Sequence, residues 1–170
     1  MKRVTIPSGA NLGALYRERV GDYPKFFKMD TLSKLGFLLT EMLVADEPGR
    51  FIPREDRAVL VFSRAGSFAD DRKYADSMAD FPSPALFVYT LPNTVTGEIS
   101  IRNKWEGETS AYVLEQKDEA LMEAIVKEAF QDRVTTSALV AWIDCTADDR
   151  WIAEACLIEK KDLIYGKLEK

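Results

Sequence analysis

The stretch that decides the fold spans residues 83–116 and reads SPALFVYTLPNTVTGEISIRNKWEGETSAYVLEQ. Its landmarks are a Leu-Pro pair at 91–92, the segment GEISIR at 97–102, a glycine at 107 and an apolar run at 109–114. Around it lies a chain of 170 residues without a single histidine. Histidine is the commonest general base near neutral pH and the commonest metal ligand. Its absence excludes Ser-His-Asp and Cys-His sites, so any chemistry must use carboxylates, Lys, Tyr or Cys, or another chain.

Before this stretch, the sequence predicts a helix and a buried strand. Leu32, Leu35, Leu39 and Met42 repeat every three to four residues behind Asp30, which can cap the first turn. The next apolar run, RAVLVF at 57–62, is rich in β-formers and is typical of a strand buried on both faces. We expect it to be the central strand.

The remaining segments complete an α/β pattern. Residues 1–29 are punctuated by Pro and Gly and predict a strand or arm followed by loop, and residues 70–80 predict a polar helix. Residues 120–130 carry one apolar face of a second strong helix. Two strands are expected at 137–145 and 151–158 across a short acidic turn. Helices alternating with apolar strands predict an α/β fold with a mixed, mostly parallel five-stranded sheet, whose two closing strands form an antiparallel edge.

Composition and charge narrow the class of protein. Residues 1–170 fit one domain, and apolar residues at 46% with charged residues at 30% are typical of a soluble globular chain. No apolar run approaches the roughly 20 residues of a membrane span, and the start of the chain lacks the apolar core of a signal peptide, so we expect a cytoplasmic protein with no membrane partner. The net charge of -5, with basic residues interleaved among acids, argues against nucleic acid.

The two cysteines give no sign of a metal or redox site. Cys145 and Cys156 lie in predicted strands, and neither belongs to a CxxC spacing or has a histidine with which to build a zinc site. Burial as small apolar residues is the favoured interpretation. We therefore expect no metal site and no cofactor.

The stretch over 83–116 resembles the first half of a β-ketoacyl synthase, the thiolase-fold condensing enzyme of fatty-acid and polyketide assembly. In that family a proline-containing segment leads into a helix that ends in a pattern like GEISIR. A basic turn with Gly follows, and then a strand delivers the nucleophilic Cys. The resemblance extends with lower specificity over residues 30–144, and it implies a thiolase-like half-domain with helices packed on the sheet.

The resemblance places Gln116 at the position of the family's catalytic Cys. It implies a chain that has lost the thiolate needed for an acyl-enzyme intermediate. The family's decarboxylating and chain-length-factor relatives also carry glutamine here. A complete synthase is about twice as long, and its second half supplies the two histidines, or histidine and asparagine, of the site. The alternative interpretation of Gln116 is a polar residue that satisfies backbone groups at a helix N-terminus.

What the resemblance implies for function is a truncated synthase-like protein of fatty-acid or polyketide-type biosynthesis, non-catalytic alone and acting as a chain-length-factor-like subunit. Two alternatives are half of a composite condensing or decarboxylating enzyme completed by a histidine-bearing chain, and a scaffold that binds a carrier protein. In condensing enzymes the strand before the nucleophile pairs across the dimer axis. The corresponding strand here, at 109–114, predicts a homodimer or a heterodimer with a full-length synthase, and acyl carrier protein is a further candidate partner.

Other polar residues have weaker claims to function. The turn SRAGS at 63–67 follows a predicted strand, where α/β proteins often bind ligands, but it lacks a phosphate-loop pattern and favours a structural turn. Arg102 and Lys104 are candidate contacts for an acidic carrier, and are otherwise solvated surface. Asp144, with its neighbours at 148–149, favours a solvated turn over a cation site. The sequence also predicts core or interface positions for four aromatic residues: Trp105, Tyr112, Trp142 and Trp151.

Overall fold

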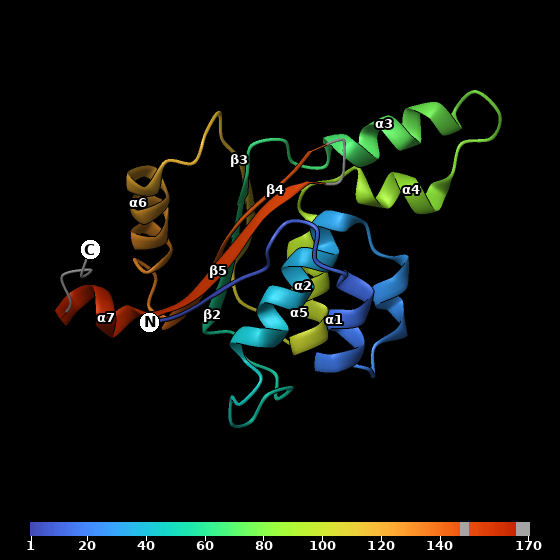
Figure 1. Ribbon diagram of the computed structural model, residues 1–170. Coiled ribbons are helices and arrows are strands. Elements are labelled where there is room, and N and C mark those ends of the chain that lie inside the picture. The colour runs from blue at the N-terminus through green and yellow to red at the C-terminus, as the bar shows by residue number, and fades with distance from the viewer. Residues whose placement is uncertain (147–149, 166–170) are drawn as a thin grey trace.

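A computed structural model describes residues 1–146 and 150–165 and shows one five-stranded sheet with helices on both of its faces (Figure 1). The strands are β1 (Lys2–Thr5), β2 (Arg57–Ser63), β3 (Thr109–Val113), β4 (Ser137–Cys145) and β5 (Trp151–Glu159). The α-helices are α1 (Leu12–Arg19), α2 (Thr31–Leu43), α3 (Phe68–Ser77), α4 (Pro84–Tyr89), α5 (Thr94–Asn103), α6 (Glu119–Ala129) and α7 (Lys160–Tyr165), and a 3-10 helix, η1, spans Pro24–Lys28.

The order of strands in the sheet is β1-β5-β4-β2-β3. β2 pairs in parallel with both β3 and β4, whereas β5 is antiparallel to β4 and to β1. Four strands therefore point the same way and β5 alone is reversed, which confirms the α/β fold class with a mixed, mostly parallel sheet. The expectation that residues 57–62 form the central strand is wrong. β4 is central, because β3 and the β5–β1 pair add to opposite sides of the β2–β4 pair. The two closing strands are antiparallel as expected, but the expectation that they form an edge of the sheet is wrong, because β1 pairs with the outer side of β5.

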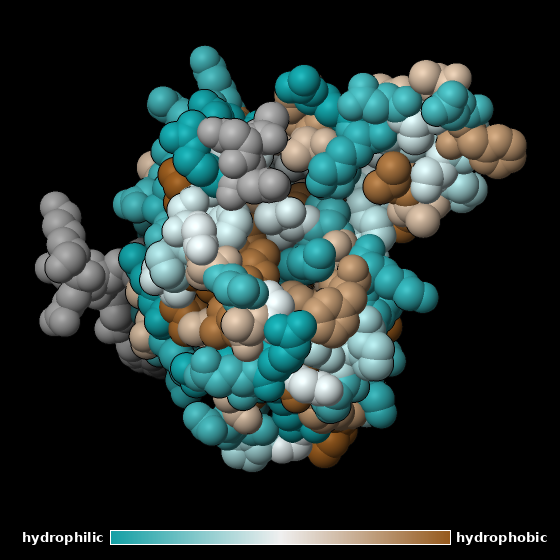
Figure 2. Space-filling model, turned by 45° about the vertical axis from the view of Figure 1, so that its right-hand side comes forward, coloured by the Kyte–Doolittle hydropathy of each residue, from teal (hydrophilic) through white to brown (hydrophobic). Residues whose placement is uncertain are grey.

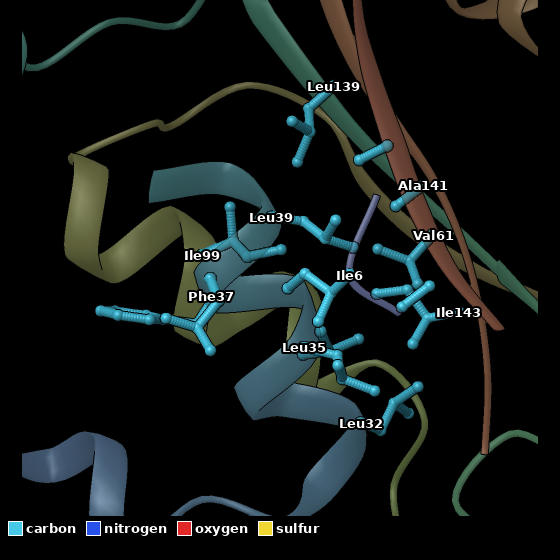
Figure 3. Packing of buried hydrophobic residues seen from close by; sticks show 14 of the residues in the cluster. Ile6, Leu32, Leu35, Phe37, Leu39, Val61, Ile99, Leu139, Ala141 and Ile143 are labelled. Carbon is cyan, nitrogen blue, oxygen red and sulfur yellow. The ribbon is translucent and has the colours of Figure 1, made fainter. Parts of the chain in front are cut away.

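The larger core lies between one face of the sheet and the helices α1, α2 and α5 (Figure 1). Figure 3 shows Leu35 and Leu39 of α2 with Ile99 of α5, facing Val61 and Ile143 on the strands. Burial of apolar side chains of this kind stabilises the fold by about 25 cal/mol for each Å² of apolar surface removed from water. On the opposite face, α6 covers β2 and part of β4 through a second cluster that includes Leu60, Phe62, Val126 and Trp142.

The N-terminal segment is more ordered than its sequence predicts. The strand is confirmed as β1, but α1 and η1 occupy part of the region where loop was expected. Asn11 accepts a hydrogen bond from the backbone N–H of Ala14 at 2.9 Å and so caps α1. Only Tyr16 of α1 is buried, where its ring stacks on Phe26 with centroids 4.4 Å apart. A helix that buries so narrow a face has little apolar periodicity, and for this reason the pattern did not reveal it.

Helices α3 and α4 form a hairpin that projects from the body of the molecule (Figure 1). The polar helix expected at 70–80 is confirmed as α3. Ser83 and Pro84 begin α4, since the Ser83 hydroxyl accepts from the N–H of Leu86 and proline suits the first helical position. The GEISIR segment lies inside α5, which ends where Lys104 adopts the left-handed conformation with φ 56°.

Candidate functional site

The parallel strands β2, β3 and β4 end at the same edge of the sheet, where α/β proteins commonly place functional groups. We call this region the strand-end site and define it as the turn at 63–67, the turn at 114–118 and Asp144. It includes Gln116. The N–H of Leu114 donates to the carbonyl of Ser63 at 2.9 Å and so joins the two turns.

Asp144 organises the turn that follows β2. Its Oδ1 accepts from the backbone N–H groups of Arg64 at 3.2 Å and Ala65 at 2.8 Å, and from the Ser63 hydroxyl at 3.5 Å. Its Oδ2 lies 3.4 Å from Nε of Arg64. The expectation of a solvated residue is wrong for Asp144, which is 7% exposed, because its carboxylate replaces water as the acceptor for two backbone N–H groups. The other two acidic positions, Asp148 and Asp149, lie outside the described residues.

The turn at 63–67 is structural, as its sequence favours. The Ser63 hydroxyl accepts from the N–H of Gly66 at 2.8 Å, and the Ser67 hydroxyl donates to the carbonyl of Thr90. Gly66 has φ +57°, a conformation that glycine adopts without a steric penalty. The N–H groups that would form an anion-binding nest are already bonded to Asp144, so the turn has no spare donors there for a phosphate.

Gln116 lies on the surface, in the bend between β3 and α6. Two residues later Asp118 caps α6, accepting from the N–H of Leu121 at 3.0 Å. Glu119 adds a second carboxylate in the first turn of the helix. Anionic side chains at a helix N-terminus offset the positive end of its dipole. This helix start therefore gives less electrostatic help to an anion at position 116 than an uncapped helix would.

Lys117 connects the same bend to the sheet through ion pairs. Its ammonium forms ion pairs with Glu154 of β5 and, at 3.3 Å, with Glu119. The hydrogen bond to Glu154 raises the pKa of Lys117 above its usual value. Lys117 thus holds the start of α6 against β5 and stays charged at all ordinary pH values.

The outer edge of the sheet beside the strand-end site is open. Within the described residues β3 pairs only with β2, so the side of β3 facing away from β2 has no partner strand. Val113 at its end is 57% exposed. β3 is therefore an edge strand of the sheet formed by the described residues.

The α3–α4 hairpin continues this open edge with apolar surface. A Cβ built on Gly66 would lie 3.4 Å from Val113 and 3.6 Å from Pro92, so the base of the hairpin adjoins the end of β3. Figure 2 shows hydrophobic surface on the projecting hairpin. Its large apolar side chains that are about half exposed or more are Phe68, Met78, Phe81, Phe87, Val88 and Leu91. Sequence reasoning missed this surface, although the apolar residues of α4 lack the one-sided spacing of a buried helix and so gave a signal.

Similar structures identify the fold. The chain matches "Ketosynthase (ApeO) in Complex with its Chain Length Factor (ApeC) from Xenorhabdus doucetiae" at 13% identity and TM-score 0.64, over 94% of this chain and 77% of that one. It matches the ishigamide ketosynthase/chain length factor at 16% identity and TM-score 0.68, over 93% and 54%. A β-ketoacyl synthase from Burkholderia phymatum STM815 matches at 13% identity and TM-score 0.58, over 86% and 47%. The chain has a thiolase-like fold.

The similarity to these structures is one of fold, and the sequence similarity is low. No family model and no curated protein matches the sequence, and the chain spans about half of the length of the second and third structures. Identities this low show the fold alone. The thiolase-like fold confirms the architecture implied by GEISIR and its flanking residues, and the role of Gln116 stays a prediction.

In this thiolase-like fold the strand-end site offers hydrogen-bonding groups but few groups suited to covalent catalysis. The Gln116 amide donates and accepts hydrogen bonds and does not ionise. Cys145 and Cys156 lie on opposite faces of the sheet, one in the larger core and the other beside α6, and form no disulfide. Within residues 1–146 and 150–165, no group of three acidic or Cys side chains is arranged to hold a metal ion.

Arg102 departs from its expected place. Its side chain is only 12% exposed and forms ion pairs with Asp22 at 2.7 Å and Glu41 at 3.2 Å. Its guanidinium also lies 4.8 Å from the ring centroid of Phe51. The interpretation of Arg102 as solvated surface is wrong, because α5 turns it toward α2. It is committed to internal contacts and is poorly placed to receive a carrier protein.

Proposed function

We propose that this chain is a chain-length-factor-like subunit that pairs with a ketosynthase through the open edge of β3 and performs no condensation itself. The observation that carries the proposal is the unpaired edge of β3 beside an apolar hairpin. This edge occurs in a fold shared with a ketosynthase bound to its chain length factor. The proposal places the chain in fatty-acid or polyketide-type biosynthesis.

The hydrogen-bonding groups of β3 support pairing at its outer edge. Glu108 accepts from Val59, and Leu114 donates to Ser63, so the even-numbered residues of this segment bond to β2. Because successive backbone groups of a strand point in opposite directions, the N–H and C=O groups of Thr109, Ala111 and Val113 point away from β2. An exposed edge of this kind is a template for another strand.

The adjoining hairpin supports burial against a partner. Phe68, Phe87 and Leu91 are 54%, 50% and 49% exposed, on a projection that contributes little to either core. Contiguous exposed apolar surface on a soluble protein commonly marks an interaction site. Main-chain pairing along β3 with apolar contacts from the hairpin gives both the geometry and the driving force for a stable complex.

The side chains of this chain indicate that the partner would carry out the catalysis. Gln116, at the position where the resemblance places the nucleophile, does not form an acyl-enzyme, and no histidine is present to polarise a thioester. The partner synthase therefore carries the thiolate and the histidines. This chain contributes the surface of β3 and the hairpin, and Gln116 is available as a hydrogen-bonding residue.

The test is co-purification with a ketosynthase from the same cell, comparing two proline variants. Ala111→Pro removes an N–H that points away from β2 and leaves the β2–β3 bonds intact. Thr5→Pro is the matched control on β1, at the other end of the sheet. It removes an N–H that points away from β5, since Ile6 pairs with Ala153. We expect a one-to-one complex with the native chain and with Thr5→Pro, and its loss with Ala111→Pro.

Three results would overturn the proposal. One is a monodisperse monomer that recovers no synthase, and another is a complex that survives Ala111→Pro. A homodimer that excludes the synthase would also refute the heterodimer. Circular dichroism of both variants establishes that each is folded before it is compared.

A further inference from the structure

A cavity on the α6 face of the sheet lies far from the β3 edge. It has a volume of about 530 Å³ and is enclosed by β4 and β5, the start of β1, and helices α6 and α7. This volume lies within the range of about 300–1,000 Å³ found for small-molecule sites. The strand order places β3 and β1 at opposite ends of the sheet, so a partner on β3 would leave the cavity open.

The cavity exists because α6 covers only part of its face of the sheet. Cα register places Cys156 opposite Val140 and Arg3, so these three side chains form a row on one face. Glu154 and Trp142 belong to the next row. α6 packs over β2 and the near side of β4, and the cavity lies over the remaining strands of this face.

The floor and walls are apolar. Val140, Trp142 and Ile158 of the sheet face Met122 and Val126 of α6 across the cavity. α7 closes one end with Leu163. Surfaces of this kind favour an apolar body over water, because water there finds few hydrogen-bonding partners.

The rim of the cavity carries charged side chains of both signs. Lys117 is paired with Glu154 and Glu119, and Lys127 is paired with Glu123. Arg3 lines the cavity, and none of the ion pairs of the described residues involves it. The β1 end of the cavity therefore carries the positive charge of Arg3, whereas the α6 side carries one carboxylate more than it has cations.

We propose that this cavity binds a small amphipathic carboxylate, with its apolar body between α6 and the sheet and its head group at Arg3. Arg3 forms no ion pair within the part of the chain that the structure describes, and a guanidinium can bind a carboxylate through two parallel hydrogen bonds. The proposal rests on the cavity and its charges and is independent of the proposed heterodimer.

Cys156 gives a direct test, because its thiol lies on the cavity floor beside Arg3. The experiment uses the full chain with Cys145→Ser and follows alkylation of Cys156 by N-ethylmaleimide, with and without dodecanoate below its micellar concentration. We expect dodecanoate to slow alkylation at least tenfold. Dodecyltrimethylammonium, which has the same tail and a positive head, should slow it less than twofold.

Two charge-reversal variants separate specific binding from adsorption. Arg3→Glu reverses the cavity charge, and Lys2→Glu makes the same change on the neighbouring residue, whose register partner Leu157 belongs to the other face of the sheet. We expect Arg3→Glu to weaken dodecanoate binding at least tenfold and Lys2→Glu to change it less than twofold. Titration calorimetry provides a second reading that does not depend on the thiol.

The proposal is wrong if dodecanoate neither protects Cys156 nor gives a saturable heat of binding. Equal losses in Arg3→Glu and Lys2→Glu would also refute it, since they would show a general charge effect. Equal protection by the cationic amphiphile would show that the cavity accepts any apolar chain. Cys156→Phe, which fills the cavity, should abolish the heat of binding in a folded protein, and undiminished binding by that variant would place the ligand elsewhere.

Discussion

Arg57 donates to both carboxylate oxygens of Glu47, through Nη1 and Nη2, each at 2.7 Å. Arg57 is the largest fully buried side chain, and its Nε donates to Ser137 at 3.0 Å. Burial raises the pKa of Glu47, but the hydrogen bonds and charge of Arg57 outweigh this effect and hold that pKa below its usual value. The pair links the loop before β2 to the start of the adjacent parallel strands β2 and β4.

Glu47→Gln should therefore destabilise the protein. The substitution leaves a buried guanidinium without its counter-charge, which costs about 2 to 3 kcal/mol for a partly accessible site. Urea unfolding at pH 7 measures the change. Glu55→Gln removes the same charge from an exposed residue of the same loop and should alter the free energy of unfolding by less than about 0.5 kcal/mol. Equal effects of the two substitutions would contradict the role given to the ion pair.

Two glycines of the family-like stretch should respond to alanine in opposite ways. A Cβ on Gly107 would lie 2.4 Å from the carbonyl oxygen of Arg57 and 2.6 Å from that of Glu55, both backbone atoms that cannot move aside cheaply. Gly107→Ala should cost more than about 2 kcal/mol and loosen β3. Gly97 lies within α5 with no atom within 4 Å of its added Cβ, so Gly97→Ala should stabilise the protein by up to about 1 kcal/mol.

Thermal unfolding of the two variants provides the measurement. The melting temperature should fall with Gly107→Ala and rise slightly with Gly97→Ala. A neutral Gly107→Ala would show that the segment before β3 can shift, and the close approach of Gly107 to residues 55–57 would then not contribute to stability.

The same glycines show how far the sequence could predict the structure. Its apolar patterns located β2, β4 and β5 and indicated a strand or arm near the N-terminus, and the resemblance over 83–116 located β3 and indicated the thiolase-like architecture. Neither source revealed why Gly107 is glycine, because its neighbours at 55–57 are distant in sequence. The order of strands was mispredicted for a related reason. A hydrophobic run shows that both faces of β2 are buried, but not which strands flank it.

The candidate site was predicted in part. The turn at 63–67 follows from local sequence, since turn residues are local signals, whereas the pairing role of the strand at 109–114 was implied by the family resemblance and not by its own pattern. The burial of Asp144 and Arg102 depends on partners such as Ala65 and Glu41, which come from other elements. The cavity beside Arg3 depends on the register of β1 against β5, which pattern alone does not fix.

Asp30 should make stability depend on pH. Burial is the main reason that the pKa of Asp30 is raised to about 6. The hydrogen bond from Ser33 lowers this pKa, and the nearby carboxyl group of Asp70 in α3 raises it. The native pKa exceeds the unfolded value of 3.8, so the native state binds more protons between those pH values. The resulting stability is complete below pH 4 and is lost as the pH rises through 6.

Asp30→Asn removes this loss while retaining an oxygen that can cap α2. The variant should be more stable than the native chain above pH 6, by on the order of 1 to 2 kcal/mol, and the difference should shrink toward pH 4. Urea unfolding from pH 4 to pH 8 measures it. Asp71→Asn, at an exposed position next to Asp70, should give a difference that is flat with pH. A flat difference for Asp30→Asn would show that Asp30 titrates normally.

A thiol introduced at position 116, where the resemblance places the family's nucleophile, should not be an activated nucleophile. The positive end of the α6 helix dipole is offset by the carboxylates of Asp118 and Glu119. The positive charge of Lys117 is paired with Glu154. Gln116→Cys should therefore have a thiol pKa near the ordinary value of about 8.5. The pH dependence of iodoacetamide alkylation, followed at that residue by mass spectrometry, measures it.

Adding Asp118→Asn should lower this pKa by a few tenths of a unit, because one compensating negative charge is removed. A pKa below about 7 in Gln116→Cys alone would mean that the bend after β3 still activates a thiolate, and the proposed loss of catalysis would then rest on the missing histidines.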